Sequence, residues 1–275
     1  MQLSGEPEES VEMKKLIRRL LNSRGYDLIK TDEFREVYPD LSDVSGLSFY
    51  RTPIGNYYVP EESANDPVAR AMARGRIFEP EVVEAASRYI EPKSIVLDVG
   101  ANYGQMSMLF SRTVGEGGEV YSFEAQEFVF DVLKRNIEAN GCRNIRPVFG
   151  AVYDKRDMDL VFPVPDFKRF GAYGSYGIDP RATSGNIVKS LTIDSMQIDK
   201  PISFMKIDIQ GSDLHALRGA VNTIREHKMP IIFEYEQQFQ DEFNTTFQDY
   251  VDFVNEINYR FESTILDINY LILPR

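Results

Sequence analysis

The stretch that decides the fold is VLDVGANYGQ, residues 96–105. An apolar run ends at an acid, Asp98, and two glycines four positions apart follow it. The apolar residues before the acid favour a buried strand, and the spacing in GQMSMLFSRTV favours a helix directly after the glycines. A strand, a glycine-bearing loop and a helix form a unit that binds its ligand at the carboxyl end of the strand.

The spacing of the glycines indicates which ligand this loop binds. Dinucleotide-binding loops carry three glycines, G-x-G-x-x-G, and the second lets the backbone approach a pyrophosphate. Here Gly100, Asn102 and Gly104 follow one another, so an asparagine replaces that second glycine. Asp98, at the strand end, would also repel a pyrophosphate. S-adenosyl-L-methionine carries an ammonium and a sulfonium and no phosphate, so we predict that these four residues contact this cofactor.

The next two strands extend the predicted cofactor site. The strand EVYSFEA ends at Glu124 and Ala125, where a carboxylate can accept hydrogen bonds from both ribose hydroxyls. The turn after the third strand, FGAVYD, places Ala151 and Val152 where this class of fold holds adenine. Two plainer alternatives stay open at this point. Asp98 could cap the following helix, and Glu124 could be a surface acid.

The pattern of the last two-thirds of the chain predicts an α/β fold. From residue 94 onward, apolar strands alternate with amphipathic helices, a pattern typical of a Rossmann-like, mostly parallel sheet covered on both faces. The last segment, YRFESTILDINYLILPR, gives two strands separated by residues 266–269, which favours an antiparallel edge strand. Ligands of such sheets bind at the carboxyl ends of the strands.

A small α+β lobe is predicted in front of this sheet. Residues 10–22 have helical spacing, and residues 47–60 have the pattern of a hairpin. Pro67, preceded by an aspartate, and Pro80 mark the starts of two further helices. The predicted domains are a helical and hairpin lobe, residues 1–90, and a cofactor-binding domain, residues 91–275.

Four segments share their pattern with one known family: VLDVGANYG, VYSFEA, LKRNIEANG and KIDIQGSDLHALRGA. They resemble the FkbM-type methyltransferases, a branch of the class I S-adenosylmethionine-dependent fold, over residues 75–240. The resemblance implies methylation of a hydroxyl, commonly on a sugar or a polyketide. It also implies that Phe78 and Glu79 form a wall of the cofactor pocket.

The chain departs from this family at Gln210, where the family usually has a glutamate. If that glutamate takes part in acceptor binding or chemistry, this member differs in its substrate or its base. If it is structural, a glutamine can keep its hydrogen bonds without the charge. We place Gln210 among the acceptor-binding residues.

Methyl transfer to a hydroxyl benefits from a positioned base, and the strand SFMKIDIQG supplies one candidate. Asp208 follows Lys206 in this strand, and the alternative is a structural lysine–aspartate pair or a helix cap. Glu234 ends the next strand, where we favour acceptor binding over a metal site shared with Asp208. His215 lies in the first turn of the helix predicted between these two strands, and it is either a neutral base or a surface histidine.

The stretch RFGAYGSYGIDP, residues 169–180, is predicted to be a lid over the acceptor. Tyr173, Ser175 and Tyr176 could stack on a sugar and hydrogen-bond to it, and the alternative is a flexible surface loop. Asp194, in SLTIDS, could cap a turn or touch the acceptor, and we favour the cap.

Composition narrows the class of protein. The net charge of −12 disfavours nucleic acid as a partner. One cysteine and two histidines, Cys142, His215 and His227, rule out an internal disulfide and a His/Cys metal cluster. The acidic start of the chain is unlike a signal peptide, and no apolar run has the length of a membrane span, so we expect a cytoplasmic protein. We keep a homodimer as one possible assembly.

The predicted function is methyl transfer from S-adenosylmethionine to a small-molecule or glycan hydroxyl, with no metal. Two other functions are alternatives to it. A nicotinamide-dependent oxidoreductase fits poorly, because Asn102 stands where the second glycine belongs and the third glycine is missing. A scaffold subunit that binds the cofactor without catalysis draws its only support from Gln210.

Overall fold

The computed structural model describes residues 46–63, 65–165 and 171–275. All of them belong to the unit that spans residues 42–275. The helix predicted for residues 10–22 lies outside the described residues. The domain boundary after residue 90 stays a prediction.

The first described elements are the predicted hairpin and the two predicted helices. They are β1 (Leu47–Thr52), β2 (Gly55–Pro60), α2 (Pro67–Ala73) and α3 (Pro80–Ser87). The side chain of Asn136 joins the hairpin to a later helix, because it accepts from the Tyr58 backbone N–H at 2.6 Å and donates to the Tyr58 carbonyl at 3.0 Å. The hairpin therefore packs on the cofactor-binding half of the chain.

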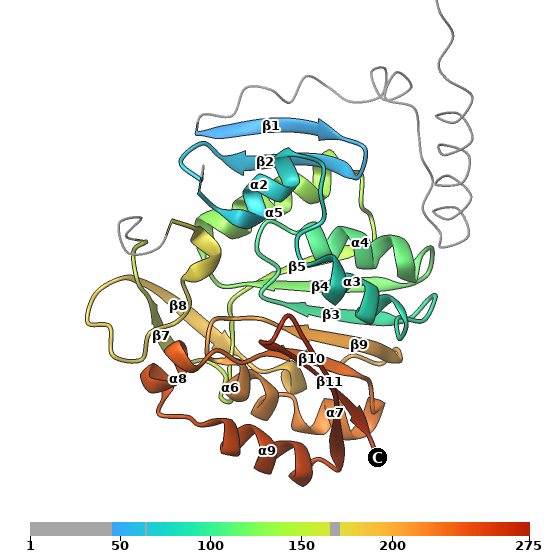
Figure 1. Cartoon of the computed structure of the whole chain (residues 1–275), viewed down its shortest axis with the longest axis vertical. Coiled ribbons are helices and arrows are strands. Elements are labelled where there is room, and N and C mark those ends of the chain that lie inside the picture. The colour runs from blue at the N-terminus through green and yellow to red at the C-terminus, as the bar shows by residue number, and fades with distance from the viewer. Residues whose placement is uncertain (1–45, 64, 166–170) are drawn as a thin grey trace, which may run out of the picture. The chain divides into compact units, whose positions relative to one another are not determined.

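A seven-stranded sheet forms the centre of the structure (Figure 1). Its strands, in the order β11-β12-β10-β9-β3-β4-β5, are β11 (Tyr259–Ile265), β12 (Asn269–Pro274), β10 (Ile231–Glu234), β9 (Ile202–Ile207), β3 (Ile95–Val99), β4 (Glu119–Glu124) and β5 (Ile145–Phe149). From β10 to β5 all neighbours are parallel, whereas β12 is antiparallel to both of its neighbours. The mostly parallel sheet is confirmed, and the reversed strand lies one position in from the edge.

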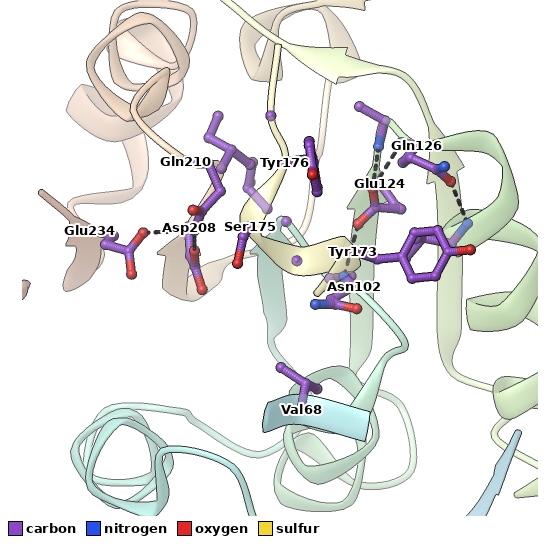
Figure 2. A pocket seen from close by; sticks show the side chains of 18 of the residues that line it. Val68, Asn102, Glu124, Gln126, Tyr173, Ser175, Tyr176, Asp208, Gln210 and Glu234 are labelled. Carbon is purple, nitrogen blue, oxygen red and sulfur yellow. Dashed lines mark hydrogen bonds between the residues drawn. The ribbon is translucent and has the colours of Figure 1, made fainter. Parts of the chain in front are cut away.

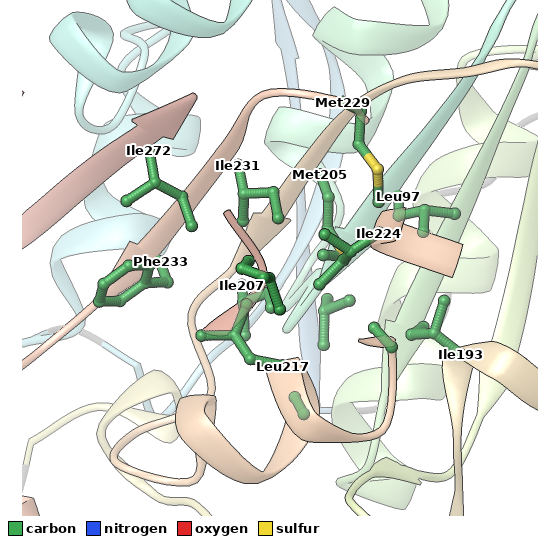
Figure 3. Packing of buried hydrophobic residues seen from close by; sticks show 14 of the residues in the cluster. Leu97, Ile193, Met205, Ile207, Leu217, Ile224, Met229, Ile231, Phe233 and Ile272 are labelled. Atoms are coloured by element: carbon green, nitrogen blue, oxygen red, sulfur yellow. The ribbon is translucent and has the colours of Figure 1, made fainter. Parts of the chain in front are cut away.

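Helices cover both faces of this sheet (Figure 1). On one face lie α3, α4 (Gln105–Val114) and α5 (Glu127–Ala139), and on the other lie α6 (Asp213–Arg218), α7 (Val221–His227) and α9 (Phe247–Glu256). On the face of α6 and α7 lies a hydrophobic core in which Leu97, Met205 and Ile231 from neighbouring strands meet Leu217 and Ile224 (Figure 3). Alternate strand residues therefore bury apolar side chains against one helical layer, as the strand period of two requires.

The sequence pattern of residues 212–228 predicts one helix, and this prediction is wrong, because α6 and α7 are separate. A Cβ on Gly219 would lie 2.0 Å from the Tyr153 carbonyl oxygen, so the chain turns where only glycine fits. The Asp194 carboxylate then starts α7 by accepting from the backbone N–H groups of Asn222 at 3.1 Å and Thr223 at 2.8 Å. The favoured interpretation of Asp194 as a cap is confirmed.

Several elements were not predicted from the sequence. A three-stranded sheet, β6-β8-β7, is formed by β6 (Ala151–Val152), β8 (Asn186–Leu191) and β7 (Asp159–Phe162). Helix α8 (Gln237–Phe243) follows β10, and the 3₁₀ helices η2 (Tyr173–Ser175) and η3 (Ile193–Met196) flank β8. Of these short elements, β6, β7 and η2 contribute residues to the walls of the site.

The buried carboxylate of Asp66 joins two elements and gives a first prediction. It accepts from the backbone N–H groups of Val68 and Ala69 at the start of α2, and from the Tyr103 hydroxyl at 2.9 Å. Asp66→Ala should lower the free energy of unfolding by about 2–4 kcal/mol, because a cap is lost and a buried hydroxyl loses its partner. Asp66→Asn keeps Oδ1 as the acceptor for the helix start, and its amide can donate to the Tyr103 hydroxyl oxygen, so it should lose much less. Urea unfolding of both variants tests this, and equal losses would contradict it.

Candidate functional site

A cavity of about 280 Å³ opens at the carboxyl ends of β3, β4, β9 and β10. Its walls also include the start of α3, strand β6 and the η2 segment. The predicted site residues that line it are Phe78, Glu79, Asp98, Gly100, Asn102, Glu124, Ala125, Ala151, Val152, Tyr173, Ser175, Tyr176, Lys206, Asp208, Gln210 and Glu234. These residues were predicted from segments that lie far apart in the chain, and the fold brings the segments together at one cavity.

The loop after β3 is held against the neighbouring strands. Gly100 donates its backbone N–H to the Phe123 carbonyl at 3.0 Å, with a positive φ of 82°. A Cβ at this position would lie 1.9 Å from the Asp208 carbonyl oxygen. Asn102 also has a positive φ, 51°, a conformation that asparagine tolerates better than most residues. The loop therefore needs its first glycine for contact with the end of β9.

Gly104 has a different role from the one predicted for it. It lies outside the residues that line the cavity and directly precedes α4, with a φ of 88°. A Cβ there would lie 2.5 Å from the Leu133 side chain on α5. The second glycine of the loop thus allows close packing of α4 and α5, as well as a left-handed turn into the helix.

Glu124 ends β4 and faces the cavity, as Figure 2 shows. Its carboxylate accepts from the backbone N–H groups of Asn102, Ala125 and Gln126, each at 2.9 Å. Burial raises the pKa of Glu124 to about 7, and these three donors oppose that rise. An ionised carboxylate offers about four acceptor positions, so one stays open for a ribose hydroxyl.

Asp98 lies in a buried polar row across the sheet. Its register partners are Ser122 on β4 and Lys206 on β9, so the three side chains share one face. Oδ2 accepts from the Ser107 hydroxyl on α4, which in turn accepts from Ser122. Oδ1 has no hydrogen-bond donor within the described part of the chain, and the Lys206 Nζ is 4.0 Å away. Asp98 is therefore not the cap of α4, and one acceptor atom is left beside the cavity.

Lys206 is a buried cation between two acids. Its side chain is 3% exposed, and its Nζ lies 3.0 Å from Oδ2 of Asp208. Burial lowers the pKa of Lys206, but the charges of Asp208 and Asp98 outweigh burial and the pKa is raised. The ion pair with Lys206 thus holds the Asp208 carboxylate at the mouth of the cavity.

A further carboxyl group, that of Glu234, faces the same end of the cavity as Asp208 (Figure 2). Glu234 is buried, and burial together with the charge of Asp208 raises its pKa well above the usual range. Gln210 lies between them and donates from Nε2 to Asp208 Oδ1 at 3.3 Å and to Glu234 Oε2 at 3.1 Å (Figure 2). The predicted base and the two predicted acceptor contacts are therefore one hydrogen-bonded group.

Phe78 and Glu79 are placed by a contact that spacing could not indicate. The Phe78 backbone N–H donates to the Gln105 side chain at 2.8 Å, and the Gln105 amide donates to the Arg76 carbonyl at 2.8 Å. Glu79 precedes α3 with a positive φ of 46°. Burial, then the charge of Asp208, raises the pKa of Glu79 to about 7.

The η2 segment lies over the loop after β3 (Figure 2). A Cβ on Gly174 would lie 2.6 Å from the Asn102 side-chain amide, and one on Gly177 would lie 3.0 Å from the Gln210 Cβ. The Tyr173 ring packs on Phe128 with ring centroids 5.2 Å apart. This segment therefore contacts both the loop after β3 and the end of β9, which is where a lid would be placed.

His215 is not brought to the cavity. Its ring stacks on Tyr153 at 4.3 Å between centroids, and Nδ1 lies 3.0 Å from Asp154 Oδ2. It lies outside the cavity lining, and its side chain is 16% exposed. Its contacts thus favour a packing role over the base that the sequence also suggested.

Sequence reasoning missed several residues of the site. Asp66, Gln126 and Glu236 line the cavity, and Ser107 bonds Asp98 from α4. Asp66 carried a signal as a helix cap, but its bond to Tyr103 joins residues 37 positions apart. Asp213 lies beside Glu234, and its Oδ1 accepts from the Glu234 backbone N–H at 3.3 Å. Such partners follow from tertiary contacts rather than from spacing.

The acceptor atoms and apolar residues of the cavity fit S-adenosylmethionine. Asp98 Oδ1, the orphaned buried acceptor, suits an ammonium group, because a buried acceptor without a donor is costly. Glu124 retains an acceptor position for a ribose hydroxyl, and Ala151 and Val152 give apolar contact surface. A pyrophosphate would face the carboxylates of Asp98 and Glu124 without a basic partner of its own.

Comparison with known proteins places the chain in a family. A family model described as the methyltransferase FkbM domain matches residues 98–261. No curated protein sequence matches.

Solved structures give more distant matches. A putative rRNA methylase from Clostridium thermocellum is 10% identical with a TM-score of 0.44, over 70% of this chain and 93% of that one. The methyltransferase FkbM from Methylobacillus flagellatus KT is 18% identical with a TM-score of 0.43, over 78% of this chain and 55% of that one. Aeropyrum pernix fibrillarin with bound S-adenosyl-L-methionine is 13% identical with a TM-score of 0.39, over 85% and 84%.

The fold and the cavity define a methyltransferase of the class I type that uses S-adenosylmethionine. The chain belongs to the FkbM methyltransferase family. The nicotinamide-dependent oxidoreductase weighed against this class is therefore excluded.

Two further observations concern metals and membranes. Across the described residues, no group of three or more histidine, cysteine, aspartate or glutamate side chains is arranged to hold a metal ion. Among the helices of residues 46–63, 65–165 and 171–275, none has the length and apolar character to span a bilayer.

The contact of Gly100 with the Asp208 carbonyl gives a second prediction. Gly100→Ala should weaken binding of S-adenosylhomocysteine more than tenfold, since the new methyl group must displace the end of β9. The matched control is Gly115→Ala, which has a similar positive φ of 63° and no atom within 4 Å of the added Cβ. That variant should lose only about 1 kcal/mol of stability through backbone strain. Calorimetric titration compares the two, and equal affinities would contradict the prediction.

The buried Asp213 gives a prediction about pH. Burial, then the charge of Asp208, raises its pKa from 3.8 to about 7, so the folded chain keeps a proton that the unfolded chain has lost. This stabilisation is complete below pH 3.8 and disappears as the pH rises through about 7. Asp213→Asn keeps the acceptor for Glu234 and removes this loss.

Between pH 4 and 8, the unfolding free energy of Asp213→Asn should therefore rise relative to that of the wild type by roughly a few kcal/mol. Urea unfolding at several pH values measures the difference. Asp131→Asn, a change at an exposed aspartate, is the control and should follow the wild type. A constant difference between Asp213→Asn and the wild type would contradict the prediction.

Proposed function

We infer that this chain transfers a methyl group to a hydroxyl of a sugar, or of a glycosylated or polyketide small molecule. The observation that carries this proposal is the Asp208 carboxylate, which faces the cavity at the end of β9 and is held 3.0 Å from the buried Lys206. A carboxylate in this position can accept the proton that a hydroxyl loses on methylation.

The chain's own residues divide into those for the cofactor and those for the acceptor. When bound, the cofactor supplies an electrophilic methyl group on its sulfonium. Asp98 and Glu124 hold the ammonium and the ribose, while Asp208 takes the proton from the acceptor hydroxyl. Gln210 and Glu234 orient the acceptor, and the η2 segment excludes water from the reacting groups.

The charge of the cavity supports a small neutral acceptor over a nucleic acid. Lys206 is the only basic side chain among the described residues that line it. The acidic side chains in the same lining are Asp66, Glu79, Asp98, Glu124, Asp208, Glu234 and Glu236. Such a surface repels phosphate groups, whereas sugar hydroxyls can donate to carboxylates and stack on tyrosine rings.

The proposal is tested by incubating the protein with methyl-labelled S-adenosylmethionine and pools of sugars, glycosides, polyketides and short RNAs. Label should appear as a methyl ether on a hydroxyl of a sugar-containing or polyketide pool. Label on RNA alone would overturn the acceptor class. Tight binding of S-adenosylhomocysteine with no transfer to any pool would favour the scaffold alternative.

A prediction about Asp208 separates its role from cofactor binding. Asp208→Asn should lower turnover by roughly 100- to 10,000-fold, the usual range for a general base. Its affinity for S-adenosylhomocysteine should stay close to that of the wild type, because Asp98 and Glu124 are unchanged. Asp157→Asn, at an exposed aspartate, is the matched control and should leave both unchanged. Unchanged turnover in Asp208→Asn would remove Asp208 as the base.

A further inference from the structure

The amide of Gln210 joins two acids at the acceptor end of the cavity. Its Nε2 donates to Asp208 Oδ1 at 3.3 Å and to Glu234 Oε2 at 3.1 Å. The amide nitrogen is the donor of the Gln210 side chain, so it is the atom that faces the oxygens of both acids. Figure 2 shows the three side chains together at one end of the cavity. The orientation of the amide is therefore fixed by its two partners.

The backbone around Gln210 holds this side chain in place. Gln210 has a positive φ of 55° and is followed by Gly211 with a φ of 93°, so the chain turns sharply after β9. The chain that follows η2 approaches at Gly177, where an added Cβ would lie 3.0 Å from the Gln210 Cβ. The turn and the approach of Gly177 thus limit the positions that the half-buried Gln210 side chain can take.

Many charged groups surround the pair of acids, Asp208 and Glu234. They are Lys206 on β9, Asp98 on β3, Asp213 on α6, Glu79 before α3 and Glu236 before α8. With one lysine among several acids, a further carboxylate at position 210 would meet like charge on either side. Two carboxylates that share a site cannot both ionise freely, so the charge at position 210 affects the protonation of its neighbours.

We propose that Gln210 is a positioning residue that holds the Asp208 and Glu234 carboxyl groups side by side at the acceptor end of the cavity. The neutral amide donates to both acids and adds no charge between them. A glutamate in its place would remove both donors and add a repulsive charge. The inference rests on the proposed function for the role of Asp208 as base, but the protonation of the pair can be measured without an acceptor.

The test compares Gln210→Glu and Gln210→Met with the wild type. Carbon-13 NMR of the side-chain carboxyl groups follows the titration of the Asp208–Glu234 pair, with signals identified through Asp208→Asn and Glu234→Gln. In Gln210→Glu the titration midpoint of the pair should rise by about one pH unit or more. In Gln210→Met, which lacks a donor and adds no charge, it should rise less. Gln197→Glu, at an exposed glutamine with a φ of 49°, is the matched control and should titrate as the wild type.

Turnover supplies the second readout. The acidic limb of the pH profile of kcat should move to higher pH in Gln210→Glu, with kcat approaching the wild-type value at high pH. A role in packing alone would lower kcat by the same factor at every pH. Wild-type titration in both Gln210 variants would overturn the proposal. If the midpoint moves but no hydroxyl acceptor is methylated, this inference stands and the proposed function fails.

Discussion

The structure depends on one buried charge, the ammonium of Lys206. With 3% of its side chain exposed, it lies 3.0 Å from Asp208 and 4.0 Å from Asp98. A cation inside a sheet is tolerated only beside opposite charge, because desolvation costs far more than a surface ion pair gains. The register of β3 against β9, which pairs Asp98 with Lys206, satisfies this need. Lys206 thus links Asp98, on the cofactor side of the site, to Asp208, on the acceptor side.

The acids around this lysine are proposed to have separate roles because their surroundings differ. Glu124 is enclosed by backbone N–H donors, whereas Asp98 has serine on one side and lysine on the other. Asp208 reaches the cavity with a side chain that is 22% exposed, while Glu234 is almost fully enclosed. Carboxyl groups a few ångströms apart can therefore hold a cofactor, accept a proton or orient a hydroxyl.

Local signals in the sequence predicted most of the fold. The apolar run before Asp98, the proline at the start of α2 and the alternation of strands and helices each depend on neighbours in the chain. Contacts between distant residues were out of reach, among them the stacking of His215 on Tyr153 and the amide of Gln105 that places Phe78. The break at Gly219 belongs to the same group, since it follows from a carbonyl that only the fold brings near. In the site, the residues at the strand ends could be predicted from the sequence, whereas their hydrogen-bonding and packing partners could not.

The contact of Gly100 with the Asp208 carbonyl has a consequence for how such an enzyme can diversify. The donor loop and the strand that carries the acid touch through backbone atoms, so neither can be reshaped without the other. Changes of acceptor must therefore come from segments outside this contact, such as the insertion between β6 and β9 and helix α8. A fixed reaction centre with exchangeable walls lets a lineage acquire new substrates while its chemistry is inherited intact.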